Sequence, residues 1–88
     1  MKNDPIRPQP HVITTRFEDG EGVLINVKTK RYYRINETGL LVWQGLQDGL
    51  TLAQISEQMT ARYVVDAEQA TIHIRALTEA FQQCQLAH

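Results

Sequence analysis

The spacing of apolar residues changes once along this chain, at Asn36. Upstream of Asn36, β-prone runs are separated by short stretches of turn residues. Downstream, apolar residues return every three or four positions, as they do on one side of a helix. Strands that all precede the helices indicate an α+β fold. We therefore expect three strands followed by three helices, with short connections that favour a winged helix-turn-helix-like arrangement.

The β-prone half predicts an antiparallel meander. The runs "VITTRF" (12–17) and "VLINVK" (23–28) flank "EDGEG", whose composition is typical of a turn, so they form a hairpin. Val23, Ile25 and Val27 share one face of the second run. The polar bend "KTKR" then leads to a third short strand over 31–35.

The helical half begins where Asn36 caps a helix with its side-chain oxygen. The apolar residues of "ETGLLVWQGLQD" are spread around most of the helix circumference, which predicts a central helix. Thr51 and Gln54 have capping-box spacing and open a second helix that buries Leu52, Ile55, Met59 and Tyr63. Asp66 opens a third helix, whose apolar stripe is formed by Ala70, Ile74, Leu77, Phe81 and Cys84.

A chain of 88 residues has material for one domain, which we place at 12–86. All three prolines lie within residues 1–10, so we expect residues 1–11 to form a flexible N-terminal arm. The single cysteine, the missing secretory signal and the absence of any run of about 18 apolar residues favour a cytoplasmic protein that does not enter a membrane.

Catalytic and metal-binding motifs are missing from the sequence. His11, His73 and His88 are scattered without metal-ligand spacing, and there is no nucleophile motif or phosphate loop. The sequence therefore predicts a protein that is not an enzyme and needs no cofactor or metal.

The third predicted strand and the bend before it carry a local excess of positive charge. No acidic residue lies between Gly22 and Asn36, and this stretch contains Lys28, Lys30, Arg31 and Arg34. Cations of this kind protect an exposed sheet edge from aggregation. They also suit an edge that is kept open for a peptide with acidic side chains. A third alternative is that the open edge pairs with a second copy of the chain.

A winged-helix DNA-binding transcriptional regulator is the main rival, because a helix-turn-helix beside a sheet is also a DNA-binding arrangement. Within residues 66–88, however, Arg75 is the only Lys or Arg, and three acidic residues accompany it. Phosphate binding needs several cations on the recognition face, and the formal net charge of the whole chain is −1. The sequence therefore favours no nucleic-acid partner.

The ordered set of features from "VLINVKTKRYYRINETGLLVWQGLQDGL" through "ARYVVD" resembles the PqqD-like family, also called the RiPP recognition element. The resemblance implies a stand-alone protein that binds the leader of a ribosomally synthesised precursor peptide. In the family the leader adds antiparallel to the third strand, against the third helix, and is presented to a maturation enzyme such as a radical SAM enzyme or a leader peptidase.

Carried over by position, the resemblance implies a peptide-binding site on the third strand and the third helix, formed by Arg31, Tyr32, Tyr33, Arg34, Ile35, Ile72, Arg75, Ala76 and Glu79. Two questions stay open at this point. Alternation puts Tyr33 with Ile35 on one face of the strand and Tyr32 with Arg34 on the other, and the sequence does not say which pair faces the peptide. The second question is which flank of the third helix faces the strand: the one named above, or the one that carries His73 and Ala80.

Overall fold

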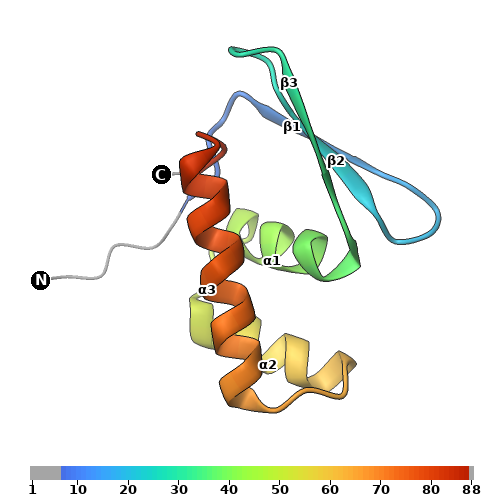
Figure 1. Cartoon of the computed structure of the whole chain (residues 1–88), viewed down its shortest axis with the longest axis vertical. Helices are drawn as coiled ribbons and strands as arrows, with labels where there is room; N and C mark the ends of the chain where they lie inside the picture. The colour runs from blue at the N-terminus through green and yellow to red at the C-terminus, as the bar shows by residue number, and fades with distance from the viewer. Residues whose placement is uncertain (1–6, 88) are drawn as a thin grey trace, which may run out of the picture.

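Three antiparallel strands precede three helices, which confirms the predicted α+β fold (Figure 1). The computed structural model describes residues 7–87. The sheet order is β1-β2-β3, so sequence neighbours are also neighbours in space. The elements are β1 (Val12–Arg16), β2 (Gly22–Asn26), β3 (Arg31–Ile35), α1 (Glu37–Gln47), α2 (Leu52–Arg62) and α3 (Ala67–Gln83).

The two hairpin turns are closed by local hydrogen bonds. In the first, Gly20 adopts a φ of 93°, which suits the left-handed residue that ends a three-residue hairpin loop. In the second, the buried Asn26 side chain accepts from the N–H groups of Lys28 (3.0 Å) and Thr29 (3.2 Å). The same side chain donates to the Gln85 carbonyl (3.2 Å), so one residue joins the turn between β2 and β3 to the segment that follows α3.

The predicted helix caps are present. The Asn36 carboxamide oxygen accepts from Gly39 N–H at 2.9 Å, and the Thr51–Gln54 capping box is formed in both directions. The Asp66 carboxylate accepts from Gln69 N–H at 2.8 Å. These bonds satisfy N–H groups that the first turn of a helix leaves without partners.

Helix α1 lies between the sheet and the other two helices, as predicted for a helix that is apolar on most sides (Figure 1). Trp43 is fully buried and its indole N–H donates to the Thr14 hydroxyl of β1 at 2.8 Å. On the other side, the Trp43 ring meets Phe81 of α3 edge-on, with ring centroids 5.2 Å apart. Trp43 therefore joins the sheet to α3 through the core.

The sheet has one covered face and one open face. Val12 and Leu24 are buried against the helices. Ile13 and Ile25 point to the opposite face, where they are partners across the strands and Ile13 is 53% exposed. The apolar set of Val23, Ile25 and Val27 thus lies away from the core, which Leu24 enters instead.

Some sequence predictions need correction or lie outside the described residues. Leu52 was expected to be buried in α2, but it is 37% exposed, while Thr78 of α3 is buried and donates its hydroxyl to the Arg75 carbonyl. The flexible arm predicted for 1–11 falls mainly on 1–6, outside the described residues, and stays a prediction. Beyond these residues, Gln9 N–H donates to the Leu86 carbonyl at 2.9 Å. No helix within 7–87 is long and apolar enough to cross a membrane.

Candidate functional site

Two main-chain bonds, one at each end of the β1–β2 pair, fix the direction of the main-chain groups in the sheet. Phe17 N–H donates to the Glu21 carbonyl at 2.8 Å, and Val27 N–H donates to the His11 carbonyl at 3.1 Å. In an antiparallel pair, the N–H and C=O of one residue point the same way, and successive residues alternate. The odd-numbered residues of β2 therefore face β1, and the even-numbered residues face β3.

The same alternation shows which groups of β3 are open. The even-numbered residues of β2 pair with Arg31, Tyr33 and Ile35. Tyr32 and Arg34 therefore direct their N–H and C=O groups away from the sheet. Within 7–87 no further strand pairs with β3. The edge offers two donors and two acceptors with the spacing that an incoming strand needs.

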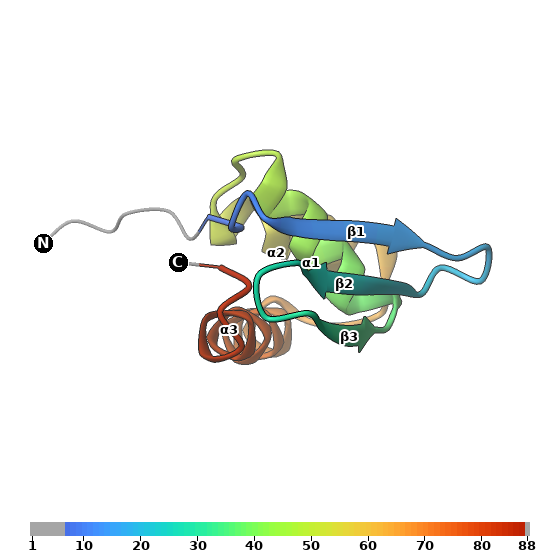
Figure 2. The ribbon, with the colours of Figure 1, turned by 90° about the horizontal axis from the view of Figure 1, so that it is seen from above.

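The side chains of β3 divide between the two faces of the sheet. Tyr33 and Ile35 are partly buried and pack against the core. Tyr32 is 72% exposed on the opposite face, where Arg34 is also exposed. Of the two pairs, Tyr33 and Ile35 lie on the face that the helices cover, and which pair contacts a peptide stays a prediction. Seen from above, α3 lies on the β3 side of the sheet and not on the β1 side (Figure 2).

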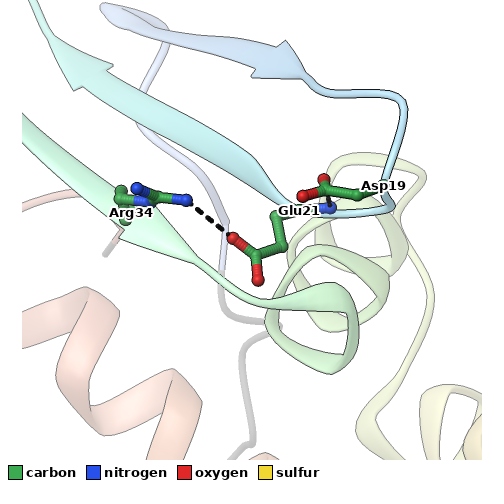
Figure 3. Close-up of polar contacts among 3 residues, drawn as sticks. All are labelled: Asp19, Glu21 and Arg34. Atoms are coloured by element: carbon green, nitrogen blue, oxygen red, sulfur yellow. Dashed lines mark hydrogen bonds and ion pairs between the residues drawn. The ribbon is translucent and has the colours of Figure 1, made fainter.

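Arg34, near the C-terminal end of β3, already has an ionic partner. Arg34 Nη2 is 2.9 Å from Glu21 Oε1, and Glu21 N–H donates to the Asp19 carboxylate at 3.0 Å (Figure 3). The two ion-pair side chains are 73% and 39% exposed, so the pair contributes about 0–1 kcal/mol. Lys28, Lys30 and Arg31 form no ion pair with other residues of 7–87. Their charges, at the other end of the edge, remain available to a ligand.

The two flanks of α3 face different neighbours. His73 Nε2 lies 3.3 Å from the hydroxyl of Thr38, which is in the first turn of α1, three residues beyond the end of β3. Ala80 shares this flank, because seven residues make almost two helical turns. On the other flank, Arg75 lines a hollow of about 200 Å³ with Leu52 at the start of α2. Glu79, four residues on, lies on the Arg75 flank.

With this geometry established, comparison with known proteins becomes informative. A family model described as coenzyme PQQ synthesis protein D (PqqD) matches residues 21–87, which is more than half of the chain. The chain belongs to the PqqD family. This confirms the resemblance inferred from its ordered motifs.

Two solved structures share the PqqD-family fold of this chain. One is a lasso peptide synthetase B1 complexed with the leader peptide, with 26% identity, a TM-score of 0.87, and coverage of 97% of this chain and 99% of that chain. The other is TbiB1 in complex with the TbiA(beta) leader peptide, with 23% identity, a TM-score of 0.86, and coverage of 93% and 94%. No curated protein sequence matches significantly.

The nine residues predicted for the site fall into three groups in this PqqD-family chain. Residues 31–35 lie together on the open edge strand. Ile72, which is 63% exposed, and Ala76 project nearly opposite the buried stripe of α3. Arg75 and Glu79 lie on the flank directed toward α2, apart from Thr38 and β3. No observation tests the binding roles of the nine residues, so these stay predictions.

Sequence reasoning missed Asn26, whose side chain holds the turn between β2 and β3 against the segment after α3. An Asn at the end of a strand and before a polar bend is a usable signal, because its side chain often bonds N–H groups two residues on. Tyr63 was read only as a core residue. Its buried hydroxyl lies close to the Glu37 carboxylate, and burial, followed by that carboxylate, raises the pKa of Tyr63.

Proposed function

We propose that this PqqD-family chain binds the leader segment of a ribosomally made precursor peptide by strand addition to β3. The observation that carries the proposal is the row of N–H and C=O groups at Tyr32 and Arg34, which no strand within residues 7–87 pairs. Main-chain bonds of this kind give an affinity that tolerates sequence changes in the ligand. The lasso peptide synthetase B1 of the same fold is complexed with a leader peptide, which supports this type of ligand.

Selectivity in this proposal comes from the side chains around the edge. Tyr33 and Ile35 lie on the helix-covered face and supply apolar contact, while Arg31 attracts acidic residues of the leader. On α3 we assign the peptide-facing role to the flank with His73 and Ala80, together with the exposed Ile72 and Ala76. Arg75 and Glu79 face toward α2, and the peptide-contact role first inferred for them has less geometric support.

As a PqqD-family member the chain acts in this proposal as a binding module and not as a catalyst. It holds the leader so that a maturation enzyme, such as a radical SAM enzyme or a leader peptidase, receives the precursor in a fixed position. It works in the cytoplasm, without a cofactor, metal, membrane or nucleic-acid partner. No observation favours the DNA-binding alternative, since Arg75 is the one cation of α3.

The test is titration of the ¹⁵N-labelled protein with defined probe peptides, followed by amide chemical shifts. The probes are the TbiA(beta) leader peptide and the peptides enriched from a phage library of random 20-residue sequences on the immobilised protein. The amides of Tyr32 and Arg34 should shift strongly and become protected from exchange with solvent. Enrichment of no peptide, or shifts confined to surfaces away from β3, would contradict the proposal.

A further inference from the structure

The charges along the open edge of β3 are unevenly distributed. At the end where β3 begins, Lys28, Lys30 and Arg31 are exposed and form no ion pair with other residues of 7–87. At the end where β3 stops, the Arg34 guanidinium lies 2.9 Å from the Glu21 carboxylate (Figure 3). One end of the edge therefore carries positive charge without a partner, and at the other end the positive charge is neutralised.

Glu21 reaches Arg34 because of the register between β2 and β3. Val23 is the direct partner of Arg34, and Glu21 lies two residues before Val23. Residues two apart on a strand share a face, so Glu21 is a diagonal neighbour of Arg34, within reach of long side chains. The Asp19 carboxylate accepts the N–H of Glu21 at 3.0 Å. Two carboxylates thus border this end of the edge, whereas no acidic residue occurs between Gly22 and Asn36.

The two ends of the edge are far enough apart to act separately. Arg31 and Arg34 are three residues apart, which is about 10 Å along a strand. Charges in solution are screened over about 8 Å at physiological ionic strength. A charged side chain of a bound peptide is therefore influenced mainly by the end of β3 that it lies beside.

An antiparallel guest strand has defined positions beside these two ends. Its residue numbers rise as those of β3 fall, as they do in β2. If one guest residue lies opposite Arg34, the residue three positions later therefore lies opposite Arg31. We call these the Arg34 position and the Arg31 position of the guest. Side chains directly opposite each other in an antiparallel pair are about 5 Å apart at Cβ and interact.

We propose that Glu21 and the unpaired cations at the start of β3 together select leaders by the place of their acidic residues. An acidic residue is favoured at the Arg31 position. It gains nothing at the Arg34 position, because Glu21 already pairs with the arginine there and repels a second carboxylate. Glu21 is therefore a specificity-determining residue, although it lies before β2 and not on the open edge. The inference rests on the proposed function, because it needs a leader paired with β3.

The test begins by assigning the register of the probe peptides on β3. Tyr33 directs its N–H and C=O groups toward β2, so a guest residue opposite Tyr33 forms a non-hydrogen-bonded pair, with Cα atoms about 4.5 Å apart. A nuclear Overhauser contact between the two Hα atoms identifies this guest residue. In an antiparallel guest, the residue before it is at the Arg34 position and the second residue after it is at the Arg31 position. Contacts that show a parallel guest would overturn the inference.

Three versions of the tightest-binding probe then separate the two positions: Gln at both, Glu at the Arg31 position alone, and Glu at the Arg34 position alone. With the wild-type protein, Glu at the Arg31 position should lower Kd about 2- to 5-fold relative to Gln, the effect of one cross-strand charge pair. Glu at the Arg34 position should not lower Kd. Equal Kd values for Glu and Gln at the Arg31 position, or an equal gain at both positions, would contradict the inference.

Substitution of Glu21 should produce a gain of binding. In Glu21→Gln the Arg34 guanidinium has lost its partner, so Glu at the Arg34 position should bind about 2- to 5-fold more tightly than Gln. Glu57→Gln is the matched control, because it removes the same charge from an exposed site on α2 and should produce no such gain. An unchanged preference in Glu21→Gln, or the same gain in Glu57→Gln, would show that Glu21 has no role in selection.

Salt distinguishes charge from shape, and the β3 amides distinguish the two proposals. At about 1 M salt, where screening acts over about 3 Å, the differences between Glu and Gln probes should disappear. Differences that persist would mean that the shape of the side chain, and not its charge, is selected. Shifts of the Tyr32 and Arg34 amides without any preference for the place of Glu would overturn the inference and leave leader binding intact. An absence of these shifts with every probe would overturn the proposed function itself.

Discussion

Proline at residue 34 tests whether a guest strand uses the open edge of β3. Arg34 N–H points away from β2, so Arg34→Pro removes a donor that the protein's own sheet does not use. The neighbouring Tyr33 N–H faces Leu24 of β2 and belongs to the ladder. Proline is compatible with an edge strand on its solvent side and disrupts a sheet on its paired side. Arg34→Pro should therefore leave the sheet intact, whereas Tyr33→Pro should disrupt it.

The expected magnitude follows from one hydrogen bond. Loss of the bond from Arg34 N–H to a leader carbonyl weakens binding by about 0.5–1.5 kcal/mol, or about 2- to 12-fold in Kd, and the proline ring hinders the guest further. Arg34→Ala is the matched control, because it also removes the exposed Glu21 ion pair and keeps the N–H. Arg34→Pro should unfold at nearly the same denaturant concentration as Arg34→Ala.

Fluorescence anisotropy with labelled probe peptides gives Kd, and urea unfolding gives the free energy of unfolding. Arg34→Pro should bind more weakly than Arg34→Ala at equal stability. Tyr33→Pro should lose stability as well, because it removes a ladder bond and the packing of a partly buried ring. Equal affinities of a folded Arg34→Pro and Arg34→Ala would refute strand addition at this edge.

Three further predictions concern stability. Asn26→Ala should lower the free energy of unfolding by about 1–3 kcal/mol in urea titrations, because it removes the part-buried hydrogen bonds of this side chain to the Gln85 carbonyl and the Lys28 N–H, and hydrogen exchange should quicken in the turn after β2. Gly22→Ala should destabilise by about 1–3 kcal/mol in the same assay, since its Cβ would lie 2.7 Å from the Thr15 carbonyl oxygen. The pKa of Tyr63 is raised in the folded state, so the phenol loses its proton in the unfolded state first as pH rises. The stability of the protein should therefore fall as pH rises above the ordinary tyrosine pKa of about 10 and through the folded pKa. In melting experiments at about pH 9–12, the stability of Tyr63→Phe should fall less than that of wild type.

Local features of the fold were predictable because they depend on residues close in sequence. Asn36, Thr51 and Asp66 bond N–H groups three residues on, so a few neighbouring letters determine where each helix begins. The charge excess around Arg31 was also visible, because no acidic residue interrupts it. Leu52 shows the limit, since its place on the helical pattern predicted burial and its position as the first residue of α2 leaves it partly exposed.

The sequence by itself determined the order of strands and helices, the helix starts and the family of this chain. Only the tertiary structure decided which face of the sheet is covered, because β2 is apolar on both faces and alternation treats Leu24 and Ile25 alike. The packing of α3 against α1 likewise decided that His73, and not Arg75, lies next to the end of β3. The covered face of the sheet and the flank of α3 near β3 both depend on contacts between distant segments. The spacing of apolar residues within one segment does not say which distant segment packs against it.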